Sequence, residues 1–220
     1  MCKKNRKSRI LYPNLIVCEG VDAYYFLLSY LAFHINKVSS FDTIQVWNFG
    51  GIDELTTELS ILQRTPGIEA LRSVIILRDA EGNAAAAVDS IRNSLGSVGW
   101  PAPATVNTFA VADDGLKVAF SLFPNFDSAT SGTLEDLCID IVKEPGAEAL
   151  RRDVEGFIES VEDKYQRGFR RHKAVLHCYF SVTKDFEGLK VGELTAANAF
   201  KLDCSPLDKL ESLLSEATKV

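Results

Sequence analysis

Short apolar runs alternate with amphipathic segments along the first half of the chain. Three runs have the length of buried strands: Asn14–Cys18, Thr43–Asn48 and Ser73–Leu77. Each run is followed by a segment with helical spacing of its apolar positions: residues 22–37, 53–63 and 84–95. This alternation predicts an α/β fold with a mostly parallel sheet flanked by helices and joined by right-handed crossovers.

The second half of the chain is predicted to be mainly helical. Residues 106–111 and 116–123 flank Asp113-Asp114-Gly115, and Asp-Gly between two apolar strands is a strong hairpin signal. Four helices are then predicted, over residues 133–142, 148–165, 172–183 and 207–217. No repeat or low-complexity linker interrupts the pattern. We therefore expect a single domain, with a sheet core over residues 12–145 and a helical extension over residues 146–220.

Acidic residues follow two of the predicted strands. Glu19 comes directly after the first strand, and Asp79 and Glu81 follow the third. Because ligands bind at the carboxyl edge of open α/β sheets, these side chains are expected to meet there. Carboxylates suit Mg²⁺ or Mn²⁺, but acids at strand ends also cap helices, and the pattern alone leaves both roles open. Asp22 is predicted to cap the first helix.

Composition and charge narrow the class of protein. The net charge of −6 argues against a protein that coats nucleic acid broadly, although a local basic patch is compatible with it. No apolar run approaches the ~18 residues of a membrane span, so no membrane association is expected. The five cysteines have no C-x-x-C spacing, which argues against zinc and predicts unpaired thiols in a reducing cytoplasm.

Two basic segments have alternative interpretations. The run from Lys3 to Arg9 is either a solvated terminus or an arm that contacts phosphates. A second cluster, between two predicted helices, comprises Lys164, Arg167, Arg170, Arg171 and Lys173. Since Lys173 and His177 share a helix face, we expect Lys173 to reach the acidic edge with His177 behind it as an orienting or proton-relaying group. The alternative is that Lys173 pairs with a surface acid and His177 is packing.

The acidic pair Glu135-Asp136 and the histidine His34 also have alternative interpretations. Thr133 and Asp136 have the spacing of a capping box, which leaves Glu135 solvated. Glu135 or Asp136 is otherwise a ligand of a second metal site. His34 lies in an almost wholly apolar helix, which favours a core histidine over a ligand.

The motifs around the acids resemble those of a known family. Glu19-Gly20 with Asp22 and Phe26 resembles the first motif of the Toprim domain, and Asp79-Ala80-Glu81 resembles its Asp-x-Asp motif. Residues 12–215 as a whole resemble a family of small stand-alone Toprim-like prokaryotic proteins of unassigned function. The stretches that support this are Ser131–Asp136, Lys173–His177 and Gly192–Asp203.

The resemblance implies a Toprim-like fold and Mg²⁺-dependent phosphodiester chemistry on nucleic acid, as in primases, topoisomerases and OLD-type nucleases. It implies that Asp79 is the main metal ligand and that Glu19 is a general acid/base or a ligand. Glu81 stands where the motif has its second aspartate, which lengthens the arm, and Ala84 replaces the usual glycine. The two hypotheses are thus a Toprim-type nuclease or nucleotidyl-transfer enzyme and a non-catalytic module that binds metal and nucleic acid or protein. A phosphatase fits less well, because it would place Asp-x-Asp after the first strand.

Overall fold

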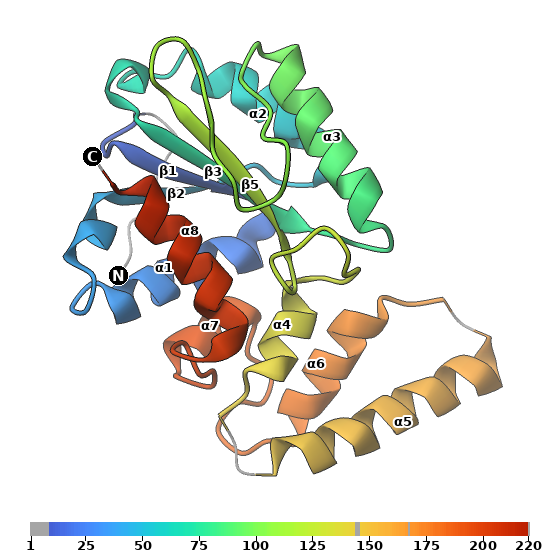
Figure 1. Cartoon of the computed structure of the whole chain (residues 1–220). Helices are drawn as coiled ribbons and strands as arrows, with labels where there is room; N and C mark the ends of the chain where they lie inside the picture. Colours follow the sequence, from blue (N-terminus) through green and yellow to red (C-terminus); the bar gives the residue numbers. More distant parts are fainter. Residues whose placement is uncertain (1–8, 144–145, 167, 220) are drawn as a thin grey trace.

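The protein is built on a five-stranded, mostly parallel sheet (Figure 1). The computed structural model describes residues 9–143, 146–166 and 168–219. The strands, in sheet order, are β2 (Ile44–Asn48), β1 (Asn14–Cys18), β3 (Ser73–Asp79), β5 (Lys117–Phe123) and β4 (Ala110–Val111). Only β4, at one edge, runs antiparallel to its neighbour. The predicted α/β fold with a mostly parallel sheet is confirmed.

Helices cover both faces of the sheet, which explains why β1 and β3 are nearly continuous apolar runs. Along β3, Val74 and Ile76 pack against α2 (Leu55–Leu62) and α3 (Ala84–Ser97). The alternate residues Ile75 and Leu77 belong to the core on the opposite face. That second core contains α1 (Gly20–His34), α4 (Leu134–Asp140), α7 (Val191–Ala196) and α8 (Asp208–Ala217).

The C-terminal helices share this second core with the sheet. α7 packs on α1, and α8 lies against β3, so both close one face of the sheet. α5 (Ala147–Tyr165) and α6 (Arg171–Ser181) form a helical hairpin that extends away from the sheet (Figure 1). The helical extension is therefore partly a structural layer of the sheet and partly a hairpin beside its carboxyl edge.

Connections from β1 and β3 leave the sheet in opposite directions. β1 leads to α1 on one face, whereas β3 leads to α3 on the other. Because β1 and β3 are neighbours, their outgoing loops separate and open a crevice between the two strand ends. Such a switch point is where ligands bind in open α/β sheets. Glu19 and Asp79 stand at this crevice.

Some local predictions were wrong in detail. The first helix begins at Gly20, so Asp22 lies in its first turn and does not cap it; Glu19 holds the cap position without a side-chain cap bond. The hairpin is confirmed, but its first strand shortens to β4, because Asn107 has a φ of 59°, which is not a strand conformation. Four short 3₁₀ segments join the other elements: Ser39–Thr43, Ile52–Glu54, Ile68–Ala70 and Ser205–Leu207.

Other sequence predictions can be compared directly with the structure. His34 is buried with its Nε2 2.7 Å from the Leu202 carbonyl oxygen, which confirms a core histidine. Cys138, Cys178 and Cys204 are free thiols, whereas Cys2 lies outside the described residues. Of the N-terminal basic run, only Arg9 is described, and it is exposed. None of the helices in the described ranges is long and apolar enough to cross a membrane.

Candidate functional site

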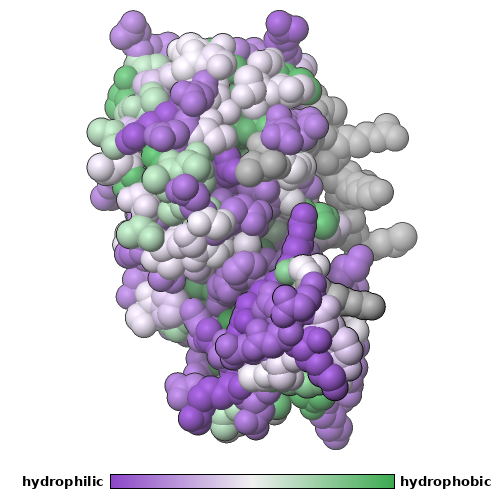
Figure 2. All heavy atoms as spheres, turned by 90° about the vertical axis from the view of Figure 1, so that its right-hand side faces the viewer, coloured by the Kyte–Doolittle hydropathy of each residue, from purple (hydrophilic) through white to green (hydrophobic). Residues whose placement is uncertain are grey.

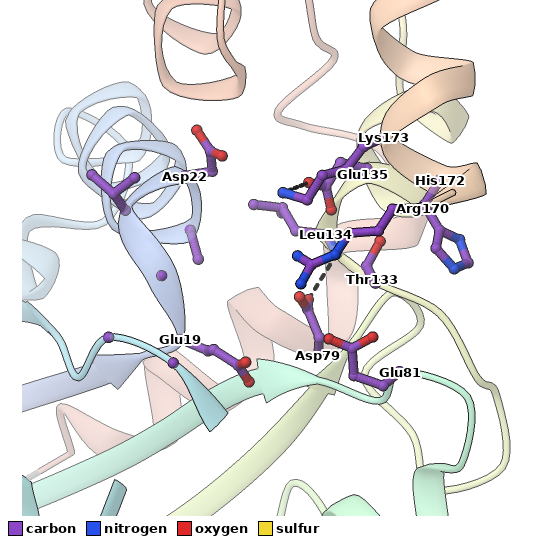
Figure 3. Close-up of a pocket in the computed structure, with 15 residues that line it drawn as sticks. Glu19, Asp22, Asp79, Glu81, Thr133, Leu134, Glu135, Arg170, His172 and Lys173 are labelled. Atoms are coloured by element: carbon purple, nitrogen blue, oxygen red, sulfur yellow. Dashed lines mark hydrogen bonds and ion pairs between the residues drawn. The ribbon is translucent and has the colours of Figure 1, made fainter. Parts of the chain in front are cut away.

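A pocket of about 310 Å³ opens at the carboxyl edge of the sheet, between the ends of β1 and β3 and the start of α6 (Figure 3). Five carboxylates line it: Glu19, Asp22, Asp79, Glu81 and Glu135. Three basic or imidazole side chains come from the beginning of α6: Arg170, His172 and Lys173. The acids that the sequence placed at strand ends therefore share one pocket with cationic groups.

Backbone hydrogen bonds fix Glu19 at the mouth of the pocket. Its N–H donates to the Leu77 carbonyl oxygen, and the Gly20 N–H donates to the Gly50 carbonyl oxygen, both over 2.9 Å. Gly20 has a φ of 78°, a conformation that glycine adopts without steric cost. The chain therefore turns sharply after β1, and the first turn of α1, including Asp22, becomes one wall of the pocket.

Behind Glu19 lies a completely buried arginine. Arg78 is 1% exposed, and its Nε is 3.4 Å from Glu19 Oε2. A guanidinium nitrogen of Arg78 also donates to the Ser90 hydroxyl on α3 over 3.1 Å. Neither Arg78 Nε nor Glu19 Oε2 has a hydrogen-bond partner among the described residues. Burial raises the pKa of Glu19; the charge of Arg78 opposes this, and the charge of Glu81 reinforces it.

Asp79 is the most strongly perturbed acid in the pocket. Its Oδ1 accepts a hydrogen bond of 2.9 Å from the Leu134 N–H. Burial, partly opposed by this hydrogen bond, raises the pKa of Asp79 from 3.8 to about 8, with further contributions from the charges of Glu135, Glu19 and Glu81. In the absence of a cation, the Asp79 carboxyl group therefore holds a proton at neutral pH.

A pair of backbone hydrogen bonds holds Glu81. Its N–H donates to the Gly132 carbonyl oxygen, and the Gly132 N–H donates back to the Glu81 carbonyl oxygen, both over 2.8 Å. Glu81 has a φ of 52°, which is uncommon for a residue other than glycine. The Ser131–Asp136 stretch noted in the sequence thus ties the loop after β3 to the start of α4.

We expect Gly132→Ala to lower the free energy of unfolding by about 2 kcal/mol. Gly132 has a φ of 135°, and a Cβ there would lie 2.8 Å from Asp136 Oδ2 and 3.1 Å from the Pro124 ring. Urea unfolding measures the change. Gly156→Ala is the matched control, because this site in α5 is open and alanine in a helix interior stabilises by about 0.5–1 kcal/mol. Equal effects of the two substitutions would contradict the close packing at Gly132.

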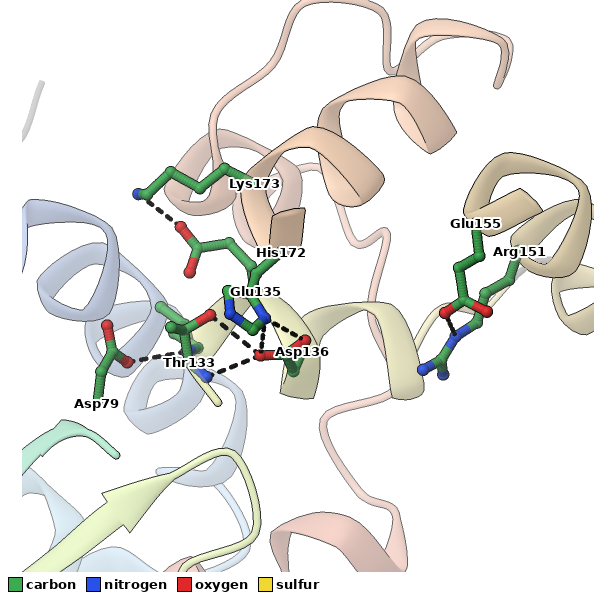
Figure 4. Close-up of polar contacts among 9 residues, drawn as sticks. Asp79, Thr133, Glu135, Asp136, Arg151, Glu155, His172 and Lys173 are labelled. Atoms are coloured by element: carbon green, nitrogen blue, oxygen red, sulfur yellow. Dashed lines mark hydrogen bonds and ion pairs between the residues drawn. The ribbon is translucent and has the colours of Figure 1, made fainter. Parts of the chain in front are cut away.

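Lys173 and Glu135 form an ion pair on the α6 side of the pocket (Figure 4). Lys173 Nζ is 2.6 Å from Glu135 Oε1, and the Glu135 side chain is only 6% exposed. Burial raises the pKa of Glu135, but the hydrogen bond and charge of Lys173 outweigh it, and the pKa is lowered. Lys173 therefore enters the acidic pocket, and the acid it pairs with is buried, not a surface acid.

The neighbouring Asp136 has a different role. It completes a capping box with Thr133, whose N–H donates to Asp136 Oδ2 over 2.8 Å, as the spacing predicts. The His172 Nδ1 lies 2.7 Å from the same oxygen (Figure 4). Asp136 does not line the pocket. The structure therefore favours the capping interpretation for Asp136 and leaves Glu135 as the acid of this pair that reaches the site.

The basic cluster divides between several environments. Arg170 and Lys173 line the pocket, whereas Arg171 pairs with Glu162 over 3.1 Å and Lys164 lies over the Tyr165 ring. Arg167 lies outside the described residues. His177 is exposed and does not line the pocket; His172 occupies the place near Lys173 that the sequence assigned to His177.

The carboxylates of the pocket are oxygen ligands of the kind that Mg²⁺ and Mn²⁺ bind. In the described part of the chain, no three His, Cys, Asp or Glu side chains lie close enough together to hold a metal ion. Mg²⁺, however, keeps several waters and is commonly bound through only one or two carboxylates. Within the described ranges Glu19 Oε2 has no hydrogen-bond partner, and the charges of the pocket acids repel one another. These features fit a hydrated cation held by Asp79 with Glu19 or Glu81, and they do not fit a closed cage of protein ligands.

Three features of the site escaped sequence reasoning. Arg78 interrupts an apolar strand, a signal that a buried charge needs a partner, but nothing local identifies Glu19 as that partner. His172 was not distinguished from His177. Gly50 and Gly51, just after β2, also line the pocket, but a pair of glycines after a strand is more often explained by a tight turn than by a ligand.

The fold and pocket define an α/β protein with a charged site at a topological switch point. The chain belongs to the family described as Protein of unknown function (DUF3226), whose model matches residues 13–219. No protein with curated annotation and no solved structure matches the chain.

Proposed function

We propose that this protein is a Mg²⁺- or Mn²⁺-dependent enzyme of Toprim type that acts on phosphodiesters of nucleic acid, as a nuclease or in nucleotidyl transfer. One observation carries the proposal. Carboxylates from the ends of β1 and β3 face Lys173 and Arg170 across a single pocket at the switch point (Figure 3). Acids that attract a cation and bases that attract phosphate are the two components that phosphoryl transfer requires.

Each side chain has a role in this proposal. A bound cation would orient the reacting oxygens and offset developing charge. Asp79 is the proposed main ligand, with Glu81 as a second. Glu19 is a further ligand, or it accepts the proton of the attacking group, and Arg78 holds it in place from behind. Lys173 places a positive charge beside the phosphate.

A second candidate is a non-catalytic module that binds metal and a nucleic acid or protein partner. The observation that favours it is the lack, among the described side chains, of a preformed three-ligand metal group. The longer arm of Glu81 and the alanine at position 84 agree with it. For either function we infer a reducing cytoplasmic location, since Cys138, Cys178 and Cys204 are free thiols.

Cleavage assays separate the two candidates. The protein is incubated with single- and double-stranded DNA and RNA in Mg²⁺, Mn²⁺ or EDTA. The enzymatic proposal expects metal-dependent cleavage or strand transfer that falls at least about 100-fold in Asp79→Asn and Lys173→Ala. Asp89→Asn, an exposed acid on α3, is the control and should retain full activity. Metal-dependent binding without any turnover would favour the module, and activity retained in Asp79→Asn would contradict both.

A further inference from the structure

The α6 side of the pocket contains a guanidinium group that has no counter-ion among the residues that the structure describes. Arg170 forms no ion pair or side-chain hydrogen bond with any residue in the described ranges, although it lines a pocket rich in acids. The next residue, Arg171, is paired with Glu162 at 3.1 Å and does not line the pocket. The two adjacent arginines therefore differ. Arg171 joins α6 to α5 through its ion pair, whereas Arg170 is available to a ligand.

Lys173 also has donor capacity left. Its ammonium carries three hydrogens, and one suffices for the 2.6 Å contact with Glu135 Oε1. Its side chain lines the pocket and is 41% exposed, so the remaining donors are accessible to a ligand there. Arg170 adds a planar fork of five donors. Together the two side chains match a group with several negatively charged oxygens.

The hairpin of α5 and α6, beside Arg170 and Lys173, restricts the shape of that ligand. The residues of α5 include six acids and only three bases. The acids are Glu148, Asp153, Glu155, Glu159, Glu162 and Asp163. α5 packs along α6, whose first residues line the pocket, and Figure 2 shows hydrophilic side chains gathered over the part of the surface that these helices form. Glu155 pairs with Arg151 and Glu162 pairs with Arg171, and the other four acids of α5 repel a long polyanion laid across the site.

The charge inside the pocket sets a further condition. Of the five carboxyl groups in the pocket, Asp79 holds a proton when no cation is bound, and the other four face the two permanent cations, Arg170 and Lys173. This excess of negative charge disfavours phosphate unless a divalent cation is also present. A phosphate monoester, with a charge near −2 and three terminal oxygens, gains more from a cation, a guanidinium and an ammonium than an internal diester with a charge of −1.

We propose that the pocket binds a phosphate monoester together with a divalent cation, and that Arg170 and Lys173 contact its terminal oxygens. The monoester is the phosphorylated end of a nucleic acid strand or a free mononucleotide. The inference rests on the proposed function and specifies its substrate: a chain end enters the pocket, while a continuous duplex is kept out by α5.

Fluorescence anisotropy with short phosphorothioate strands tests this substrate class, because such strands resist cleavage during the measurement. Strands that carry a 5′-phosphate, a 3′-phosphate or neither are compared in Mg²⁺ and in EDTA, with a mononucleotide and a long duplex without terminal phosphates as competitors. A terminal phosphate at either end should tighten binding roughly tenfold, in Mg²⁺ only. Competition by the mononucleotide at similar concentration identifies free nucleotides as ligands; its failure to compete identifies strand ends.

Arg170→Gln should remove the preference for a phosphorylated end, whereas Arg171→Gln, the matched control, should keep it. Both substitutions lie at exposed or half-exposed sites, and thermal melts should show both variants folded. The inference would be overturned if a terminal phosphate did not tighten binding, or if its effect survived in EDTA or in Arg170→Gln. Equal binding of the unphosphorylated duplex would overturn it as well. Stabilisation of the parent protein by Mg²⁺ through Asp79 is measured separately, without phosphate. If Mg²⁺ does not stabilise the parent, the proposed function itself fails, and not only the inference on the substrate.

Discussion

Asp79→Asn is expected to stabilise the metal-free protein at pH 8 and to abolish its stabilisation by Mg²⁺. The pKa of Asp79 is raised from 3.8 to about 8 in the folded protein. The protonated form therefore contributes stability that is complete below pH 4 and is lost as the pH rises through 8. At about 1.4 kcal/mol per pH unit, the parent loses on the order of 3 to 6 kcal/mol across this window. Asparagine carries no charge and removes the loss.

The stabilisation of the parent protein by Mg²⁺ should increase with pH, whereas the stability of the metal-free protein decreases. A cation needs the ionised carboxylate, so Mg²⁺ competes with the proton and should stabilise the parent more at pH 8 than at pH 6. Thermal melts of parent, Asp79→Asn and Asp89→Asn with and without Mg²⁺ give both results. If Asp79→Asn is less stable than the parent at pH 8 without metal, burial and repulsion do not control this carboxyl group. If all three proteins respond to Mg²⁺ alike, the metal binds elsewhere.

Arg78→Met is expected to lower the free energy of unfolding by about 3–5 kcal/mol. The substitution removes the only positive charge recorded within ion-pair distance of Glu19 among the described residues, and leaves that half-buried carboxylate uncompensated. Glu19→Gln should also destabilise the protein, because it leaves the buried guanidinium of Arg78 without its negative partner. The double variant should cost less than the sum of the two, since it removes both charges and leaves a neutral, well-filled space.

Urea unfolding of the two single variants and the double variant gives the coupling energy. Arg72→Met, at an exposed position just before β3, is the matched control and should change stability by less than about 0.5 kcal/mol. A cost for Arg78→Met no larger than this control, or strict additivity in the double variant, would show that Arg78 does not support Glu19.

The parts of the fold and site that the sequence predicts are those set by local pattern. β1 and β3 are apolar runs that end at acids, so Glu19 and Asp79 could be placed at the carboxyl edge before any contact was known. Thr133 and Asp136 satisfy a capping box within four residues. In such cases neighbours in the chain determine the outcome.

The parts that escaped depend on contacts between distant segments. Arg78 pairs with a residue 59 positions earlier, which only the parallel pairing of β1 and β3 brings close. His172 and His177 both lie on α6, and the packing of α6 against α4 and α5 decides which of them faces the pocket. Asp22 was assigned a cap because the positive φ of Gly20, which starts the helix two residues earlier, has no local signature beyond glycine itself.

The central claim is that the carboxyl edge of the sheet holds a divalent cation through Asp79. Crystals of the protein soaked in Mn²⁺ test it most directly, since manganese gives an anomalous signal that identifies its position. We expect one peak in the pocket, in contact with Asp79 and with Glu19 or Glu81, and no peak there in Asp79→Asn crystals. A manganese peak of full occupancy elsewhere, or a pocket without manganese at saturating concentration, would contradict the account.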